Sequence, residues 1–590
     1  MTKADRLIES RELFEKTVDY YDNEKFGFDV SISERLKENL DFYTGVGQWP
    51  EDVKQELRAR YKPALVINRV APAINQVSGY ERQNRTEIKP FAFETSDSNQ
   101  AFVMEYVLKH VHRSFDAAFN NSQGFLKGIV TSEAHWEYSI DIGDDGLPEI
   151  ARELLPTGSV KWDPLSKRYD HADARFCFQD SWMAEDELLQ LRPTLKDKEL
   201  EYEQKTDGVI TAANDYKWRE SRYFYDDYTK KVRLIRSWKK RWEKEYVVTD
   251  RENPAEIQIL DQKQIKEIDI ENPTFTIRPR MRSKISYQMF SGDEELAYDE
   301  VVSTSIIPII SFYCFYIEGV YFSLVDLAKD RQRQVNKADS VMSDYLSRLP
   351  KLSVMAEERA FRTPEDARKF NGADVGDSMV FADGALSNGS VQFPSIPGLN
   401  IISYYTQLKE SQKTEMKDIM GVSDTMQGIK PKGAQSGVAF DILRQQGLTV
   451  TEPIYDNYNA TKRMMGKLEI ELIQKHYPPE KIERIMGGLA NMYRDDKLQN
   501  IWEQARDDEE ARRKLVDVLM TTKYDCMMDE GFNTTTIRQS NQIQFNQLMQ
   551  SGFPVPPDII IEHSDISQDQ KDQWKAFIQQ QQQMGTEGLQ

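Results

Sequence analysis

Residues 324–349 read LVDLAKDRQRQVNKADSVMSDYLSRL and are followed at once by Pro350. Selected residues recur there at intervals of four and three, the spacing of a helix that packs along one seam. They are Leu324, Ala328, Arg331, Val335, Ala338, Met342, Tyr345 and Leu349. The pattern lasts nearly four heptads and predicts a helix about 39 Å long. Because the other faces are charged, we expect this helix to pack on neighbouring helices and not inside a globular core.

The composition indicates a folded protein with a polar surface. The chain has 590 residues, enough for several domains, with 39% hydrophobic and 29% charged residues and a formal net charge of −20. No apolar run approaches the roughly 20 residues that span a bilayer, and the charged N-terminal stretch does not resemble a secretion signal. Three widely spaced cysteines match no metal-ligand pattern, so we expect buried thiols, a reducing compartment and no metal or other cofactor. A net negative chain is not expected to hold nucleic acid through its overall field.

Motifs of catalysis are missing. The sequence contains no GxxxxGK[ST], no GxGxxG after a strand, no HExxH and no GxSxG. Its six histidines are scattered, and no nucleophile and base can be paired, so the chain is not predicted to be an enzyme. Two other functions stay open at this point, a nucleic-acid-processing enzyme or motor subunit and a cellular coiled-coil scaffold.

One basic stretch is interleaved with Trp238 and Trp242. Such a stretch can contact nucleic acid by charge and stacking, although a half-buried strand with a solvated basic face is the more common outcome. Its cations are Lys230, Lys231, Arg233, Arg236, Lys239, Lys240, Arg241 and Lys244.

The order of patterned segments predicts an α+β fold that is mainly helical. Residues 65–82 are apolar at helical spacing and predict one long helix kinked by Pro72. Residues 88–94 alternate like a strand, and Asp144-Asp145-Gly146 between alternating runs predicts a hairpin. Residues 351–398 contain many Gly and Pro and predict a small α+β module between the helix at 324–349 and a return helix at 399–420.

A long loop follows the return helix. Residues 421–437 read GVSDTMQGIKPKGAQSG, which is longer than helix–helix connections usually are, and they carry Lys430 and Lys432. Residues 438–476 then predict one long helix, with Gly447, Pro453 and Gly466 as kinks. Residues 477–590 are mainly helical, with a strand-like stretch at 523–528 and a Gln-rich end.

This order of segments resembles a portal protein of tailed bacteriophages, and most of all the portals of short-tailed phages. Seven local segments support the resemblance, and it covers nearly the whole chain. They are 39–43 with Gln48-Trp49, 77–79 with 82–85, Trp162-Asp163-Pro164, Asp173-Ala174-Arg175-Phe176, Lys329-Asp330 with Gln332 and Asn336, Lys523-Tyr524-Asp525, and Pro554–Pro557.

The resemblance implies a ring, typically of twelve subunits, at the capsid vertex of the head–tail junction, assembled in the host cytoplasm. It implies a wing (1–320), stem helices (321–350 and 399–420), a clip (351–398), a tunnel loop (421–437), a kinked wing helix (438–476) and a crown with a short tail (477–590). Double-stranded DNA would pass through the channel during packaging and ejection. Terminase, tail adaptor or head-completion proteins, capsid and scaffolding proteins would be the partners, with no membrane. The tunnel-loop residues nearest to DNA would be Lys430, Lys432, Gln427 and Gln435.

Two physical points agree with this resemblance. A ring of twelve would carry twelve times −20, or −240, which suits a channel that must not retain DNA. The charged seam residue Arg331 would face an acidic group on the return helix, and we expect Glu410 or Glu415.

Overall fold

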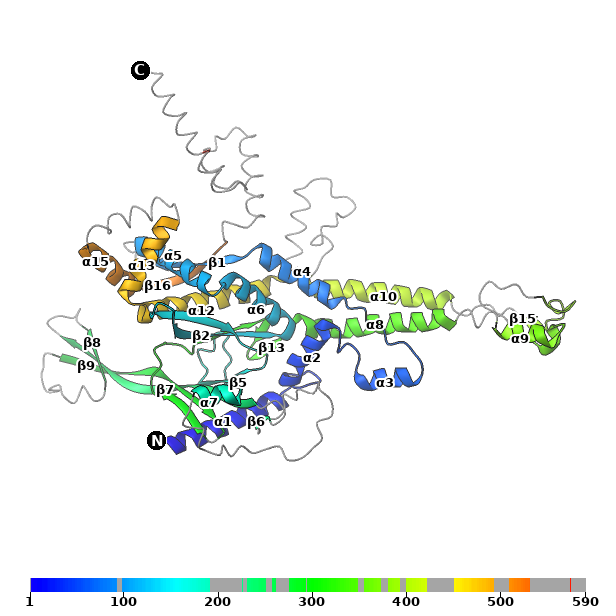
Figure 1. Ribbon diagram of the computed structural model, residues 1–590, viewed down its shortest axis with the longest axis horizontal. Helices are drawn as coiled ribbons and strands as arrows, with labels where there is room; N and C mark the ends of the chain where they lie inside the picture. The colour runs from blue at the N-terminus through cyan, green and yellow to red at the C-terminus, as the bar shows by residue number, and fades with distance from the viewer. Residues whose placement is uncertain are drawn as a thin grey trace, which may run out of the picture.

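A computed structural model provides the coordinates of the chain (Figure 1). The structure describes residues 2–92, 98–191, 225–226, 231–250, 257–261, 275–292, 294–348, 355–372, 380–392, 399–421, 450–492, 509–530 and 574. Its body mixes helices with antiparallel sheets, which confirms the predicted α+β class.

The main hydrophobic core lies between helices and a small sheet. The sheet has the strand order β11–β2–β3, and its strands are β2 (Glu133–Ile142), β3 (Pro148–Leu154) and β11 (Ile309–Tyr313). β2 and β3 form the hairpin predicted around Gly146. The helices that contribute to this part of the body are α2 (Ile32–Thr44), α4 (Val70–Gln83), α5 (Ser98–Ser114), α6 (Ala117–Thr131), α12 (Glu452–His476), α13 (Pro479–Met492) and α15 (Glu509–Thr521).

A second, larger sheet lies beside this core. Its strand order is β10–β9–β7–β5–β4, and two short strands, β6 and β8, also pair with β7. Helix α1 (Lys3–Asn23) packs on it through Phe14, whose ring meets Phe178 edge-on at 5.4 Å. The strands are β4 (Val160–Trp162), β5 (Phe176–Ala184), β6 (Tyr225–Asp226), β7 (Lys231–Asp250), β8 (Ile257–Asp261), β9 (Phe275–Ser291) and β10 (Glu294–Asp299).

Two segments that are far apart in the sequence form a two-stranded sheet. β1 (Thr86–Ala92) pairs antiparallel with β16 (Tyr524–Glu530), which confirms both predicted strands. Helix α12 packs closely beneath them at Gly466, where an added Cβ would lie 2.4 Å from Cγ2 of Ile88 and 3.0 Å from Sγ of Cys526. Gly466 therefore allows close helix–sheet packing.

Two antiparallel helices project from the body, α8 (Leu324–Arg348) and α10 (Leu399–Ile419) (Figure 1). A small module lies beyond their outer ends, and its three aromatic rings, Phe361, Phe370 and Phe381, pack on one another. Its elements are β14 (Met355–Ala356), a 3-10 turn (Glu358–Ala360), α9 (Pro364–Gly372) and β15 (Val391–Gln392). The remaining elements are α3 (Glu51–Ala59), α7 (Glu185–Leu191), β12 (Phe315–Ile317) and β13 (Val320–Phe322).

Two predicted helices have different bounds. Residues 62–69 are not helical, and α4 begins only at Val70, so Pro72 lies in its first turn, where a missing N–H does not break the helix. The helix predicted over 438–476 begins at Glu452, because Val450 and Thr451 form a turn. Pro453 is thus part of a helix start and not a kink, and residues 438–449, including Gly447, lie outside the described residues.

Candidate functional site

The inner part of the predicted α8 seam is buried, whereas its outer part is not. Met342 and Tyr345 are half-buried near the outer end of the helix, and Leu349 lies outside the described residues. Leu324 and Ala328 join the main core together with Met416 and Met420. Four seam residues are at most 1% exposed, namely Leu324, Ala328, Val335 and Ala338.

Polar contacts between α8 and α10 run in antiparallel order. Nζ of Lys409 lies 2.6 Å from Oδ1 of Asp339. Nearer the body, Nε of Arg331 lies 3.2 Å from Oε2 of Glu415, so the predicted acidic partner of Arg331 is present. The other candidate, Glu410, pairs with Lys413 of its own helix. Because the Arg331 and Glu415 side chains are 37% and 42% exposed, the ion pair adds little stability in one subunit.

A second face of α8 binds the backbone of an extended segment, an arrangement that we call the polar clasp. It consists of Gln332, Asn336 and Ser340 together with residues 65–69. The backbone N–H groups of residues 65, 67 and 69 donate to Ser340 Oγ (2.9 Å), Asn336 Oδ1 (3.0 Å) and Gln332 Oε1 (2.9 Å). Gln332 Nε2 also donates to the carbonyl of residue 67 at 2.7 Å. Helix residues four apart and strand residues two apart both advance about 6–7 Å, so the two ladders stay in register.

The polar clasp is tied to α2 as well. Asn336 Nδ2 donates to Gln48 Oε1 at 2.8 Å, and Gln48 donates to the carbonyl of Phe42 at 3.0 Å. Asn68 donates to the carbonyl of Tyr43 at 2.7 Å. The side chains of Gln48 and Asn336 are fully buried, so their mutual hydrogen bond is shielded from water.

The inner end of α8 is held by charge and by a cap. Ser323 Oγ accepts from the backbone N–H of Asp326, and Asp326 accepts from that of Ser323, which is a reciprocal helix cap. One carboxylate of α2, Glu38, receives both Lys329 (2.7 Å) and Arg333 (2.8 Å). The root of the projecting pair is therefore fixed on α2 by several independent contacts.

The inner end of α10 meets the beginning of α12. Gly421 has a φ of +66°, and an added Cβ would lie 2.9 Å from Cβ of Val450. Gly421 and Val450, the described residues on either side of 422–449, are therefore in contact. The predicted tunnel-loop residues Lys430, Lys432, Gln427 and Gln435 belong to that segment and lie outside the described residues.

The cations predicted around Trp238 mostly hold the fold together. Arg233 lies 2.5 Å from Asp180, and Arg236 lies 2.5 Å from Glu137. Trp238 is buried, and Lys240 donates to the carbonyl of Ala172 at 2.9 Å. The half-buried strand is thus the interpretation that the structure favours for this part of β7.

Sequence reasoning missed the polar clasp. A faint signal was available, because Gln332 and Asn336 are uncharged amides four residues apart on a helix otherwise rich in charge. Among the described residues, no group of three or more His, Cys, Asp or Glu could hold a metal ion. No described helix is long and apolar enough to cross a membrane.

The family model described as Phage P22-like portal protein matches residues 23–589, which is 567 of 590 residues. The chain therefore belongs to the portal protein family of tailed phages, as the sequence resemblance indicated. A search of curated proteins found no match.

Proposed function

We propose that this portal protein forms a ring of twelve subunits at one capsid vertex, through which double-stranded DNA is packaged and later ejected. The observation that carries the proposal is the family match over 567 residues, on a chain whose α8 and α10 project as a pair from a mixed α/β body. In this assignment residues 1–320 are the wing, 321–350 and 399–420 the stem, and 351–398 the clip. Residues 421–437 are the tunnel loop, 438–476 the long wing helix, and 477–590 the crown and tail.

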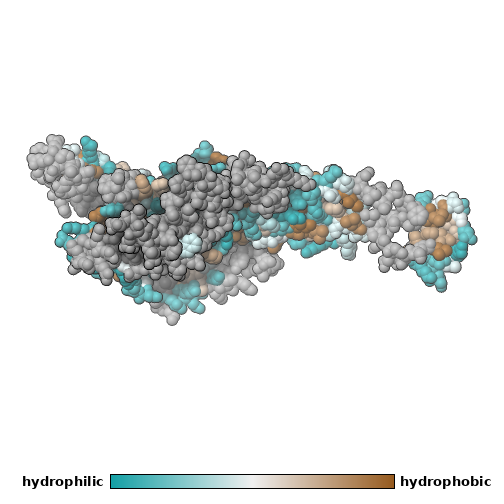
Figure 2. All heavy atoms as spheres, turned by 90° about the horizontal axis from the view of Figure 1, so that it is seen from above, coloured by the Kyte–Doolittle hydropathy of each residue, from teal (hydrophilic) through white to brown (hydrophobic). Residues whose placement is uncertain are grey.

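The surface of the helical pair supports contacts between subunits. Hydrophobic side chains gather on the outer part of the pair (Figure 2), and Leu346 of α8 is 50% exposed. Closing a ring joins one patch of a subunit to a different patch of the next. The outer part of the seam, Met342, Tyr345 and Leu349, would then be completed by the neighbouring subunit.

The contact between the residues on either side of the tunnel-loop segment supports a role of that segment at the channel wall. Gly421 and Val450 are adjacent, so the segment that carries Lys430 and Lys432 begins and ends at the root of the stem. These two cations and the amides Gln427 and Gln435 would approach the phosphates, while the net charge of −240 for twelve chains disfavours lasting retention.

The module beyond the outer ends of the pair is the part best placed to meet other proteins. We assign the docking of terminase during packaging, and of tail adaptor proteins afterwards, to residues 351–398, of which the described parts, 355–372 and 380–392, lie beyond the outer ends of α8 and α10 (Figure 1). Capsid and scaffolding proteins would contact the wing, as expected at the head–tail junction of a virion assembled in the host cytoplasm.

The mass of the purified protein tests the ring. Twelve chains of 68.6 kDa give about 823 kDa, and native mass spectrometry with negative-stain imaging should show that species with a central channel. A monomer of 68.6 kDa under every assembly condition would contradict the proposal.

Charge reversal tests the tunnel loop separately. Lys430→Glu with Lys432→Glu should reduce DNA packaging or retention while rings still assemble. The matched control is Lys3→Glu with Lys16→Glu, two exposed lysines of α1. Packaging equal to wild type in the first variant would refute a contact between the loop and DNA.

A further inference from the structure

A ribbon of β7 and β9 extends from the larger sheet, away from α8 and α10 (Figure 1). Cross-strand partners share a face of a sheet, and alternate residues along each strand return to that face. The pairs on one face of the ribbon are Arg241 with Lys284, Glu243 with Arg282, Glu245 with Arg280, and Val247 with Arg278. The sequence alone did not bring the cations of β9 beside those of β7.

Cations outnumber carboxylates on this face. Lys284 pairs with Glu243 at 2.8 Å, and Glu245 receives both Arg280 (3.2 Å) and Arg282 (3.7 Å). Among the residues that the structure describes, neither Arg241 nor Arg278 forms an ion pair, and the Arg278 side chain is exposed. The ribbon face therefore presents free guanidinium groups on a chain whose net charge is negative.

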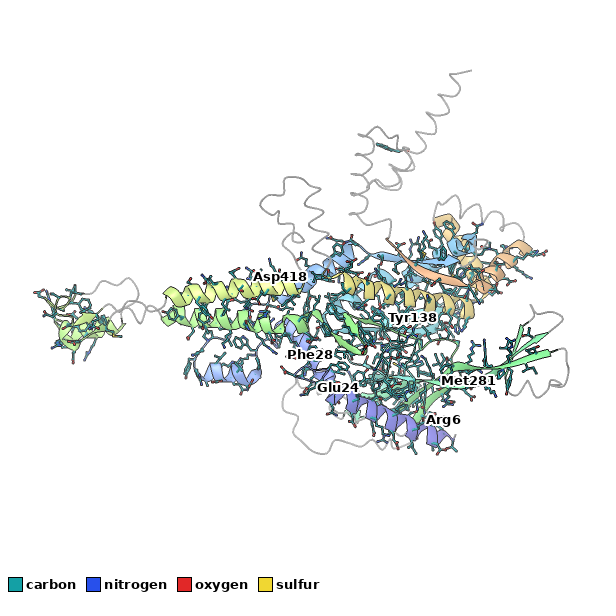
Figure 3. The ribbon with its side chains drawn as sticks, turned by 180° about the vertical axis from the view of Figure 1, so that it is seen from behind. Arg6, Glu24, Phe28, Tyr138, Met281 and Asp418 are labelled. Carbon is teal, nitrogen blue, oxygen red and sulfur yellow. The ribbon has the colours of Figure 1, made fainter. Side chains whose placement is uncertain are left out.

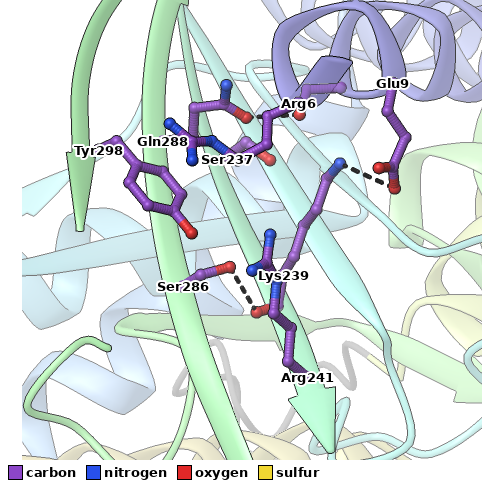
Figure 4. A pocket seen from close by; sticks show the side chains of 9 residues that line it. Arg6, Glu9, Ser237, Lys239, Arg241, Ser286, Gln288 and Tyr298 are labelled. Atoms are coloured by element: carbon purple, nitrogen blue, oxygen red, sulfur yellow. Dashed lines mark hydrogen bonds and ion pairs between the residues drawn. The ribbon is translucent and has the colours of Figure 1, made fainter. Parts of the chain in front are cut away.

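The same face continues into a pocket at the root of the ribbon (Figure 4). Lys239 and Ser237 lie two and four residues before Arg241 on β7, so they share its face of the sheet. The register places Lys239 opposite Ser286 and Ser237 opposite Gln288. Arg6 of α1 lies beside this root, while Met281 lies farther out along the ribbon (Figure 3). The groups that line the pocket are three cations, four hydroxyls, one amide and one carboxylate, from Arg6, Lys239, Arg241, Ser10, Ser237, Ser286, Tyr298, Gln288 and Glu9.

Two donors in the pocket have no partner. Ser237 is 1% exposed, and its Oγ forms no hydrogen bond in the described structure. The buried Nε of Arg6 also lacks an acceptor, although its Nη2 lies 3.4 Å from Glu295. Buried donors are rarely left unsatisfied, so these two groups are able to donate to an acceptor as small as one oxygen atom.

The charge of the pocket indicates the kind of acceptor. Burial lowers the pKa of Lys239, and the nearby Arg241 lowers it further, while Glu9 at 3.6 Å raises it. An anion bound beside Lys239 and Arg241, at the mouth of the pocket, would offset that repulsion. Over the pocket and the ribbon face, seven cations face four carboxylates, a local excess of three positive charges. The cations are Arg6, Lys239, Arg241, Arg278, Arg280, Arg282 and Lys284, and the carboxylates are Glu9, Glu243, Glu245 and Glu295.

We propose that the ribbon face and the mouth of the pocket form a second contact surface for the phosphate backbone of duplex DNA. This inference rests on the proposed function for the presence of DNA. Arg, Lys, Ser, Gln and Tyr side chains are the usual donors to DNA phosphates. The four cations of β9 recur every second residue, about 7 Å apart, and form a row about 20 Å long. Such a regular row suits a polyanion of regular charge spacing better than the scattered carboxylates of a folded protein.

DNA binding by the assembled protein tests this surface. Fluorescence anisotropy would measure the binding of two short duplexes of unrelated sequence between about 50 and 200 mM salt. Arg241→Ala with Arg278→Ala should weaken the binding of both duplexes equally and lower the salt slope by about 2. Neither arginine is ion-paired, so the change leaves no carboxylate without a partner. The matched control, Arg58→Ala with Arg82→Ala, removes two exposed arginines elsewhere and should bind like wild type.

Two further measurements distinguish the phosphates of DNA from the carboxylates of an acidic polypeptide. Lys239→Met should lower the salt slope by about 1 more, because Lys239 would contact a phosphate at the mouth of the pocket. Competition by polyglutamate as effective as competition by unlabelled duplex, at equal charge concentration, would overturn the assignment to DNA. Wild-type binding in the double-arginine variant would overturn the surface itself. If the double-arginine variant binds DNA like wild type and its rings still package DNA, the contact surface is refuted while the proposed function stands.

Discussion

The polar clasp predicts a local loss of stability when Gln332 is truncated. Gln332→Ala removes the acceptor of the N–H of Arg69 and the donor to the carbonyl of Ile67. Each buried polar group left without a partner costs about 1–3 kcal/mol. Because residues 65–69 are only partly buried, water can replace part of the loss, and we expect about 2 kcal/mol in total, the lower end of that range for two groups.

Hydrogen exchange measures this loss where it occurs. A change of about 2 kcal/mol corresponds to roughly thirtyfold in the opening equilibrium, so the amides of residues 65, 67 and 69 should exchange about thirtyfold faster. Gln334→Ala is the matched control, because Gln334 is an exposed glutamine on the same helix. The Gln334→Ala substitution should change the free energy of unfolding by no more than about 0.5 kcal/mol.

One result would refute the reasoning about the clasp. If exchange at residues 65–69 were equal in the Gln332→Ala and Gln334→Ala proteins, the hydrogen bonds of Gln332 would not hold the segment. A uniform acceleration over the whole body would instead mean that the substitution destabilises the fold globally, and a local clasp would again be excluded.

Two further predictions concern α8 and α12. Val335→Asp should lower the thermal midpoint of unfolding, because a charge placed at a residue that is 1% exposed costs about 3 kcal/mol or more. The control Gln334→Asp, on the exposed face of the helix, should leave the midpoint unchanged. Equal midpoints in the two variants would contradict burial of Val335. Burial lowers the pKa of Lys462 from 10.5 to about 8, so the unfolded chain binds more protons between those values and the free energy of unfolding should rise with pH from about 8 to 10.5. Lys462→Met should show a smaller rise in denaturant titrations, and an identical pH dependence would count against this prediction.

The seam of α8 was predictable because its signal is local. Leu324, Ala328 and Val335 repeat within one helix, and an antiparallel return helix brings Glu415 within reach of Arg331. The polar clasp was not predictable in the same way, since its partners are more than 260 residues apart in the sequence. Residues 65–69 carry a helical apolar pattern, yet their N–H groups bind side chains of α8 and the chain stays extended.

The ribbon illustrates a second limit of sequence reasoning. The basic stretch of β7 was visible, but whether a cation is free depends on its cross-strand partner. Arg233 meets Asp180 within the body, whereas Arg241 lies opposite Lys284. The neighbouring strands of β7, which are β5 within the body and β9 along the ribbon, separate the structural cations from the free ones.

The polar clasp also determines how the projecting pair can bend. Its outermost contact is at Ser340, so the described part of α8 overhangs it by residues 341–348, about 12 Å at 1.5 Å per residue. So short an unsupported part of a helix bends little. A sideways force on the outer module would therefore rotate α8 and α10 together as a rigid body about their contacts with α2 and residues 65–69. Mechanical load would thereby reach the N-terminal part of the body directly.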